Sequence, residues 1–315
     1  MQQKVVALGG GHGLAATLAS LRQITPLITA IVTVADNGGS SGRLRQEFPI
    51  LPPGDLRMAL AALCADDDWG REWATIMQHR FTGEGSLQGH AVGNLLLAAL
   101  WDRDEDPVAG LDRVASLLKV VGRVLPMASQ PLDIEATFQD GGRFTVVRGQ
   151  AQVATAKGKL ESLRIIPQDP PSRGEALSAI ADADWITMGP GSWISSVLPH
   201  LLVPSQRRAL VESKGKRIVM LNLDAVPELS GNEYAGYTPE EHLGLIRQYA
   251  PDFQADFVIA DFSVVRDLNS LENQVRAMGG ELVTADLRKA VGSVHHDVEK
   301  LTSVFGHIMS NSLIG

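Results

Sequence analysis

The stretch that decides the fold is KVVALGGGHGLAATLASLRQI, residues 4 to 24, together with ITAIVTVA at residues 28 to 35. A short apolar run meets a glycine turn, a run with helical spacing follows, and a second apolar, β-branched run comes next. This order of strand, glycine turn, helix and strand is typical of a βαβ unit with two parallel strands. Gly11, Gly13 and Ala16 also fit the pattern G-x-G-x-x-A, in which glycines let the backbone approach a pyrophosphate at a helix N-terminus. The stretch therefore predicts a nucleotide-binding α/β fold.

The rest of the chain continues the alternation of helices and strands. We expect further strands at DWITMG (184–189), RIVMLNL (217–223), DFVIAD (256–261) and ELVTADL (281–287), with amphipathic helices between them. The segment at about 140–166 differs, because RFTVVRGQAQVAT and KLESLRIIP indicate short antiparallel strands around a turn at Lys157–Gly158–Lys159. We predict a single α/β domain over residues 1–315, a Rossmann-like three-layer sandwich with a mostly parallel sheet and a small β insertion. Ligands of such sheets bind at the carboxyl ends of the strands.

Composition narrows the class of protein. The 315 residues include 28 Lys and Arg and 36 Asp and Glu, which gives a net charge of −8. Nucleic-acid-binding proteins usually have an excess of basic residues instead. The one cysteine, Cys64, cannot form an internal disulfide, which favours a reducing compartment. The N-terminus lacks the pattern of a signal peptide, and no apolar run reaches the length of a membrane span. We expect a cytoplasmic, soluble protein that binds no nucleic acid, and a homodimer is the usual assembly for this class.

Two glycine-rich loops follow neighbouring strands. The first is Gly9 to Gly13, and Asp36 lies about 20 residues past its fingerprint, where an acid would meet a ribose hydroxyl. The second is Asn37-Gly38-Gly39-Ser40-Ser41-Gly42, which can form a nest of N–H groups with two hydroxyls as further donors. Two donor-rich loops at adjacent strand tips indicate a ligand with more than one anionic group.

Three other loops carry weaker signals. Asp55, after Pro53-Gly54, either caps the next helix or joins Asp36 in holding Mg²⁺. GHAVGN (89–94) and Gly189-Pro190-Gly191-Ser192 each lead from a loop into a helix. The pair His295-His296 with Asp297 lacks the spacing of a zinc site, so we favour a role at the start of a helix over a ligand contact. No P-loop or G-x-S-x-G motif occurs in the sequence.

The ordered set of motifs resembles a known family. ALGGGHGL, TAIVTVADNGGSSGRLR, PPGDLRMALAAL, RFTGEGSLQGHAVGNLLLAAL, GRVLPM and MGPGSWISSVLPHLL are similar to the gluconeogenesis factors of the YvcK type, especially the actinobacterial branch. This family belongs to the wider group that contains 2-phospho-L-lactate transferase of the CofD type, and the likeness extends over about residues 4 to 300. It implies a Rossmann-like fold and a cytoplasmic protein needed for normal cell shape and wall synthesis on gluconeogenic carbon sources. It also implies binding of UDP-sugars, above all UDP-N-acetylglucosamine, and control of amino-sugar precursor supply through glucosamine-6-phosphate synthase.

The resemblance also implies a set of ligand-binding residues, which match the family's motifs. They are Gly10, Gly11, His12, Gly13, Asp36, Asn37, Gly38, Gly39, Ser40, Ser41, Asp55, Asn94, Gly189, Pro190, Gly191, Ser192, Asn222 and His296. The chain departs from the family in two places. Asp36-Asn37 stands where two acids are usual, and AVPELSGNEYAG (225–236) differs from the family's loop.

Three functions follow from these observations. The first is a binding regulator, with no catalytic residue and no required cofactor, that recognises a UDP-sugar or related nucleotide. The second is a phosphoryl- or nucleotidyl-transferase in which Asp36 and Asp55 hold Mg²⁺ against the phosphates of a donor. The third is a nicotinamide dehydrogenase, which the glycine fingerprint alone suggests and which leaves the second glycine loop unexplained.

Overall fold

The computed structural model describes residues 2–104, 106–223 and 237–311. The unusual segment 225–236 lies outside the described residues. The main element is a seven-stranded sheet of order β10-β9-β8-β7-β1-β2-β3, in which every pair of neighbours is parallel. Its strands are β1 (Val5–Gly9), β2 (Ile28–Val32), β3 (Arg123–Pro126), β7 (Trp185–Met188), β8 (Lys216–Met220), β9 (Phe257–Asp261) and β10 (Glu281–Ala285). The predicted α/β class with a mostly parallel sheet is therefore confirmed.

The strand order reverses at β1. The chain runs outward from β1 to β2 and β3, then returns to the other side of β1 as β7 and continues to β8, β9 and β10. Because crossovers between parallel strands are right-handed, the helices that follow β1 and β7 leave toward opposite faces of the sheet. The loops after these two strands consequently diverge, and a crevice opens between them at the carboxyl edge of the sheet.

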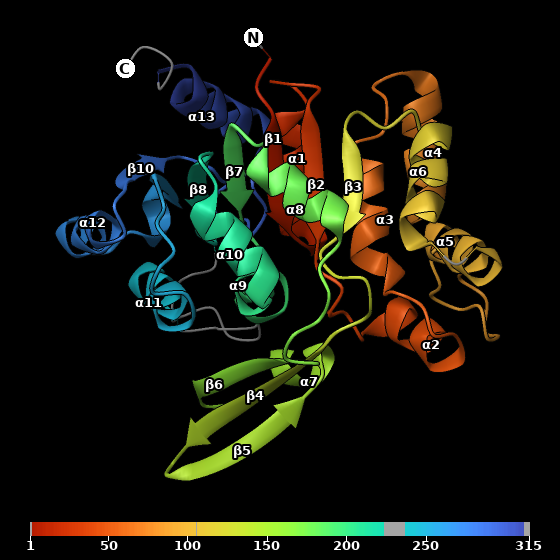
Figure 1. Ribbon diagram of the computed structural model, residues 1–315, viewed down its shortest axis with the longest axis horizontal. Coiled ribbons are helices and arrows are strands. Elements are labelled where there is room, and N and C mark those ends of the chain that lie inside the picture. Colours follow the sequence, from red (N-terminus) through yellow and green to blue (C-terminus); the bar gives the residue numbers. More distant parts are fainter. Residues whose placement is uncertain (1, 105, 224–236, 312–315) are drawn as a thin grey trace.

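Helices cover both faces of the sheet (Figure 1). On one face α1 (Gly11–Leu21) packs against α3 (Pro53–Ala62) and α13 (Val298–Asn311), and the layer continues through α4, α5 and α6. On the other face α10 (Pro204–Glu212) packs against α8 (Gly174–Ala181) and α9 (Leu198–Leu202), and α11 joins α9 to α12. The remaining bounds are α2 (Gly39–Glu47), α4 (Asp68–Gln78), α5 (Val92–Arg103), α6 (Pro107–Leu117), η1 (Trp193–Val197), α11 (Pro239–Tyr249), η2 (Phe262–Val264) and α12 (Leu268–Ala277).

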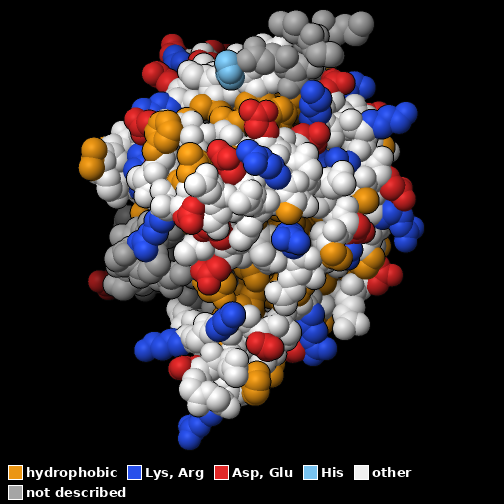
Figure 2. Space-filling model, turned by 90° about the vertical axis from the view of Figure 1, so that its left-hand side faces the viewer, with side chains coloured by type: hydrophobic (Ala, Val, Ile, Leu, Met, Phe, Trp, Pro, Cys, Tyr) orange, Lys and Arg blue, Asp and Glu red, His pale blue; other side chains and the backbone are white. Residues whose placement is uncertain are grey.

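The core forms where the sheet meets these layers. β1 is buried along its whole length, as a strand covered on both faces must be, and this explains its continuous apolar run. Thr238 and Glu241 form a capping box at the start of α11. Among the described residues, no helix is both long and apolar enough to cross a membrane. The face shown in Figure 2 carries basic and acidic side chains interspersed, with hydrophobic side chains in small groups.

The β insertion is larger than expected. It contains β4 (Asp133–Asp140), β5 (Arg143–Arg148), the short helix α7 (Gln150–Ala154) and β6 (Lys159–Ile166). The expected hairpin between residues 143–155 and 159–166 is wrong, because β5 and β6 both pair with β4 and not with each other. The insertion thus begins at 133 and not near 140. Its antiparallel sheet projects beyond the carboxyl edge of the main sheet (Figure 1).

The strand that was not predicted, β4, shows the alternation that is typical of strands. Buried and half-buried residues alternate from Asp133 to Phe138, with Ile134, Ala136 and Phe138 facing inward. Such alternation is the pattern of a strand with one covered face. The prediction that residues 150–154 belong to a strand is wrong, because they form the short helix α7, which follows Gly149.

Candidate functional site

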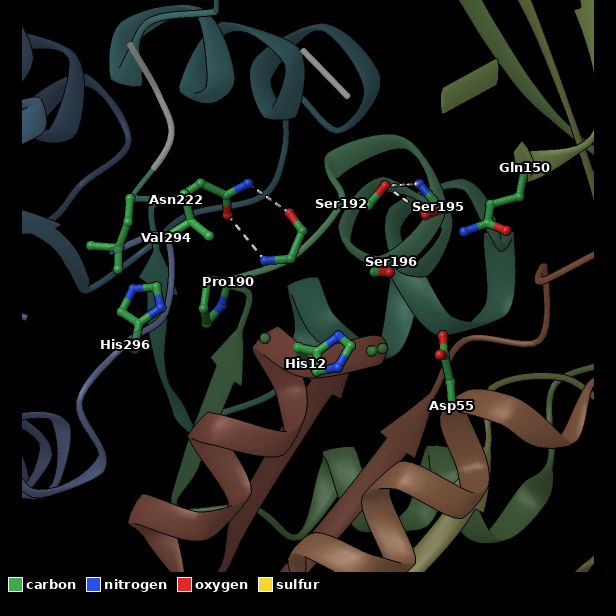
Figure 3. Close-up of a pocket in the computed structure, with 15 residues that line it drawn as sticks. His12, Asp55, Gln150, Pro190, Ser192, Ser195, Ser196, Asn222, Val294 and His296 are labelled. Atoms are coloured by element: carbon green, nitrogen blue, oxygen red, sulfur yellow. Dashed lines mark hydrogen bonds between the residues drawn. The ribbon is translucent and has the colours of Figure 1, made fainter. Parts of the chain in front are cut away.

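A cleft with a volume of about 350 Å³ lies at the point where the strand order reverses (Figure 3). Its walls come from the loops that follow β1, β7 and β8, from the start of α3, from α7 and from the loop before α13. The lining residues are Gly10, Gly11, His12, Gly13, Asp55, Gln150, Pro190, Gly191, Ser192, Ser195, Ser196, Asn222, Leu223, Val294 and His296. Side chains far apart in the sequence thus meet where ligands of parallel α/β sheets bind.

The glycine loop after β1 leaves no room for side chains at two positions. A Cβ atom on Gly13 would lie 2.2 Å from the carbonyl oxygen of Pro190, and one on Gly10 would lie 2.4 Å from Oδ2 of Asp55. The loop therefore packs backbone against backbone and leads directly into α1, whose first turn holds no acidic residue. The positive end of a helix dipole with free N–H groups favours an anion.

The loop after β7 is held by its own side chains. Oγ of Ser192 accepts hydrogen bonds from the backbone N–H (3.1 Å) and the hydroxyl of Ser195, so Ser192 caps the π-helical turn η1, which begins at Trp193. Asn222, in the loop that follows β8, also holds the loop after β7, since its Oδ1 accepts from the N–H of Gly191 at 3.0 Å and its Nδ2 donates to the carbonyl of Gly191 at 2.9 Å (Figure 3). Asn222 lines the cleft, and its amide group positions the Gly191 backbone.

Asp55 lies in the first turn of α3 and points toward the cleft (Figure 3). The interpretation of Asp55 as the helix cap is wrong, because the residue at the cap position is Pro52 and the helix begins at Pro53. Burial raises the pKa of the Asp55 carboxyl to about 7, and repulsion by Asp36 adds to the rise, while a hydrogen bond from the backbone N–H of Gly11 opposes it. Near neutral pH this carboxyl group is therefore divided between its charged and neutral forms.

The second glycine segment is not the open loop that the sequence suggested. Gly38 occupies the cap position of α2, which begins at Gly39, and Asp36 accepts a hydrogen bond from the N–H of Gly38 at 2.8 Å. Ser40 and Ser41 are buried in the first turn of this helix. Ser41 Oγ accepts from the N–H of Gly54 at 3.0 Å, so this hydroxyl joins α2 to α3.

Asn94 takes part in the same buried network. Its Nδ2 donates to Oγ of Ser40 at 2.9 Å, and Ser40 Oγ also lies 2.9 Å from Nδ1 of His90. Asn94 is 1% exposed and does not line the cleft. The residues Asp36 to Ser41 and Asn94 thus lie behind Asp55 and form the support on which the cleft is built.

The β insertion reaches the cleft through α7. Oδ1 of Asn37 accepts a hydrogen bond from the N–H of Ala151 at 3.0 Å, and Nδ2 of Asn37 lies 3.4 Å from Oε1 of Gln152. This contact fixes the start of α7 beside the second glycine segment, and Gln150 consequently lines the cleft. No motif in the sequence pointed to Gln150, because its place depends on how the insertion folds back.

The loop before α13 closes another side of the cleft. His296 lines it together with Val294, and burial lowers the pKa of the His296 imidazole to about 4, although the Asp261 carboxylate opposes this change. The neutral ring has a buried Nε2 with no hydrogen-bond partner among the described residues. Asp297 accepts from the N–H groups of Glu299 and Lys300 at 2.9 and 3.0 Å. The expected role at the start of a helix thus belongs to Asp297, and His296 faces the cleft.

The predicted site is largely assembled in one place. Ten of its eighteen residues line the cleft, namely Gly10, Gly11, His12, Gly13, Asp55, Pro190, Gly191, Ser192, Asn222 and His296. Gly189 lies under the loop after β7, where its carbonyl accepts from the hydroxyl of Thr17. The sequence reading missed Gln150, Ser195, Ser196, Leu223 and Val294. Ser195 and Ser196 stand in GSWISS directly after a predicted strand, which was the signal that could have identified them.

Asp36 and Asp55 are the acidic pair that could hold a metal ion. The charge of Asp36 acts on Asp55, and no group of three or more His, Cys, Asp or Glu side chains suited to a metal occurs among the described residues. Mg²⁺ commonly takes one or two carboxylates and completes its shell with water and ligand phosphates. The pair fits such a shared site and not a closed structural metal site.

Comparisons with known proteins identify the family of the chain. The family model for 2-phospho-L-lactate transferase CofD matches residues 5–305. The chain belongs to the CofD family. Within this family it is 46% identical, over 320 residues, to a Mycobacterium tuberculosis protein provisionally named a gluconeogenesis factor. The alignment covers 99% of this chain and 92% of that relative. It is 38% identical over 248 residues to the gluconeogenesis factor of Halalkalibacterium halodurans, covering 79% of this chain and 74% of the relative.

A solved structure shows the same arrangement of elements. The crystal structure of a UPF0052-family protein from Bacillus halodurans superposes on this CofD-family chain with a TM-score of 0.83 and 32% sequence identity. The match covers 96% of this chain and 98% of that chain. The resemblance to the gluconeogenesis factors and the Rossmann-like fold that it implied are therefore confirmed.

Proposed function

We propose that this CofD-family protein is a binding regulator that takes a nucleotide sugar of the UDP-N-acetylglucosamine type into the cleft. The observation that carries the proposal is the meeting of two tight backbone loops, Gly10–Gly13 and Pro190–Ser192, at the N-terminus of α1. Backbone N–H groups at a helix N-terminus bind pyrophosphate, which a nucleotide sugar contains. Together with the hydroxyls of Ser195 and Ser196, this wall suits a phosphate-bearing ligand.

The opposite walls suit the uncharged parts of such a ligand. The neutral imidazole of His296 offers Nε2, and Gln150 offers an amide with two donors and an acceptor. Hydroxyl and amide groups of a sugar or a base are recognised by side chains of this kind. Asp55 lines the cleft between these walls, and its carboxyl group can accept a hydrogen bond from a ribose or sugar hydroxyl.

The names of the relatives support a role as a gluconeogenesis factor, and the motif resemblance extends this proposal to cell-wall precursor supply. As a gluconeogenesis factor, the protein would report the supply of nucleotide sugar and adjust amino-sugar precursor synthesis, with glucosamine-6-phosphate synthase as partner. This role supports cell shape and wall synthesis during growth on gluconeogenic carbon sources, and it places the protein in the cytoplasm as a homodimer. A regulator of this kind acts because ligand binds its two states with different affinity.

Calorimetric titration tests the proposal. We expect UDP-N-acetylglucosamine to bind with or without Mg²⁺ and without product formation, and NAD, GDP and UTP to bind more weakly. Asn222→Ala removes two hydrogen bonds to Gly191 and should weaken binding by about 5- to 150-fold, because each bond contributes ~0.5–1.5 kcal/mol. Asn273→Ala, on α12, is the matched control and should bind as the wild type does. If the wild type and Asn222→Ala bind UDP-N-acetylglucosamine with equal affinity, the cleft is not its binding site.

A second candidate is a transferase of phosphoryl or nucleotidyl groups, and the acidic pair favours it. Asp36 and Asp55 would hold Mg²⁺, which would neutralise charge on the phosphates of a donor. The raised pKa of Asp55 fits a carboxylate whose charge a cation stabilises. This function predicts metal-dependent turnover that Asp55→Asn abolishes, and turnover that persists in this variant would rule out the assignment.

A further inference from the structure

Three arginines gather behind the acidic pair, where α2, α3 and α5 come together on the right of Figure 1. Arg43 lies on α2, Arg57 lies on α3, and Arg80 precedes the loop that leads to α5. We call these three residues the arginine cluster. None of them lines the cleft between β1 and β7, and the proposed function makes no use of them.

Arg57 is the most buried member of the cluster. It is 3% exposed, and its Nε is buried without a hydrogen-bond partner among the described residues. Its aliphatic stem packs so tightly on the first turn of α5 that a Cβ on Gly93 would lie 2.8 Å from Cγ of Arg57. Burial and, to a smaller extent, the charge of Arg80 lower the pKa of Arg57 to about 10, against the opposing charges of Asp55 and Asp36, so the guanidinium stays charged at neutral pH.

The other two arginines bond to backbone carbonyls and not to carboxylates. Arg43 donates to the carbonyls of Ser86 (3.3 Å) and Gln88 (2.6 Å), and Arg80 donates to the carbonyl of Gly89 at 2.8 Å. Both therefore hold the loop between Arg80 and α5 while their positive charges remain uncompensated. Within the described part of the chain, no carboxylate lies within 4.0 Å of a nitrogen of the cluster.

The nearest charged groups do not supply a counter-ion. Asp55 and Asp36 act on Arg57 only through space, and Asp55 is partly protonated at neutral pH. Glu47 acts at a distance on His90, whose own pKa is lowered by burial and then by Arg43, so this ring adds little charge. A buried cation without a partner destabilises a fold by several kcal/mol as an order of magnitude, so an anion from outside the chain is the expected partner.

We propose that the arginine cluster is a binding subsite for a phosphate group, with the buried Arg57 as its central ligand and the exposed Arg80 as a second ligand. Guanidinium groups match the geometry of phosphate oxygens, and several of them together form charge-assisted hydrogen bonds. Asn94, in the same turn of α5 as Gly93, has a buried Oδ1 without a described partner. A hydrogen-phosphate group can satisfy both an orphaned donor and an orphaned acceptor. The subsite does not depend on nucleotide-sugar binding in the cleft.

Inorganic phosphate is the probe for the full chain. Its binding is followed by calorimetry and by the shift in melting temperature, with sodium chloride at equal ionic strength as the reference. Arg57→Met should weaken phosphate binding about tenfold or more and leave the unliganded protein at least as stable as the wild type, because an uncompensated buried charge is removed. A purely structural role for Arg57 predicts the reverse, namely a less stable protein with unchanged phosphate affinity.

Two further variants keep the test decisive if Arg57→Met does not fold. Arg80→Gln alters an exposed side chain and should still weaken phosphate binding several-fold, whereas Arg208→Met, an exposed arginine on α10, should not. Asn222→Ala should retain phosphate binding, since it affects only the cleft. Phosphate that binds no better than chloride, or whose affinity is unchanged in Arg80→Gln, would overturn the proposal. Loss of phosphate binding in Asn222→Ala would also overturn it, because the phosphate would then occupy the glycine loops.

Discussion

Replacement of Asp55 by Asn should stabilise the unliganded protein at alkaline pH. The carboxyl group has a pKa of about 7 in the fold against 3.8 in the unfolded chain, so the folded state binds more protons between these pH values. Stability therefore falls as pH rises through this window, by the linkage between proton binding and folding. Asparagine keeps an acceptor for the Gly11 N–H and carries no charge, so the variant should not show this loss.

The magnitude follows from the two pKa values. The loss amounts to about 2 kcal/mol at pH 5 and about 4 kcal/mol at pH 8, as upper limits, so the advantage of Asp55→Asn should widen by about 2 kcal/mol between these pH values. Reversible urea unfolding of both proteins at pH 5 and pH 8, without nucleotide or divalent metal, measures this difference. Asp182→Asn, at the exposed end of α8, controls for the loss of a surface carboxyl.

One result would refute this reasoning. If Asp55→Asn shifts the free energy of unfolding by the same amount at pH 5 and pH 8, Asp55 does not titrate in this window, and neither burial nor Asp36 perturbs it. Asp36→Asn gives a second check, because removal of the repulsive partner should lower the pKa of Asp55 and make the pH dependence smaller.

Two other changes test how the cleft is built. Gly13→Ala should lower the melting temperature and weaken nucleotide-sugar binding, because the new Cβ would lie 2.2 Å from the carbonyl oxygen of Pro190. The control is Gly244→Ala on α11, where a Cβ atom would meet no other atom within 4 Å. Asp261→Ala should destabilise the protein by about 3–5 kcal/mol, as loss of a buried charged partner does, since Asp261 accepts from Leu287 N–H at 2.7 Å and faces Arg288. Thermal unfolding measures the stability of both variants. If Asp261→Ala changes the free energy of unfolding by less than about 1 kcal/mol, the Asp261 carboxylate does not stabilise the loop before α13.

Asp261 also makes the stability of the protein depend on pH in the acidic range. Burial opposes its ionisation, yet hydrogen bonds from Ser263 and Leu287 and the charge of Arg288 prevail and hold the pKa of this carboxyl below its ordinary value. The stability that it contributes is present above the unfolded pKa and is lost as pH falls through the folded pKa. The loop before α13, which carries His296, should loosen first on acidification.

Local pattern in the sequence was sufficient for most elements of the fold. The continuous apolar runs at β1 and β7 indicated strands covered on both faces, and the order of strand, glycine turn, helix and strand indicated that β1 and β2 are parallel. The same turn, with Pro190–Ser192 after another strand, identified both backbone walls of the cleft. These features depend on residues that are close in the chain, so propensity, hydrophobic period and turn chemistry describe them directly.

Other features depend on contacts between distant segments. Whether Gly38 to Ser41 form a loop or begin a helix was decided by burial of Ser40 against His90 and Asn94, and by the bond from Gly54 to Ser41. Gln150 reaches the cleft only because β4 pairs with both β5 and β6 and because Asn37 holds the start of α7. Local sequence cannot indicate which of several polar residues will be buried by such pairings.

The sequence by itself thus determined a parallel α/β sheet with a glycine-lined, phosphate-type site at its carboxyl edge, because glycine spacing and apolar runs act over a few residues. Only the tertiary structure decided the chemistry of the charged groups. The pKa of Asp55 depends on burial and on Asp36, 19 residues earlier in the chain, and the uncompensated charge of Arg57 depends on α2, α3 and α5 meeting. Burial and electrostatic proximity arise from packing between elements, and the order of residues does not encode them locally.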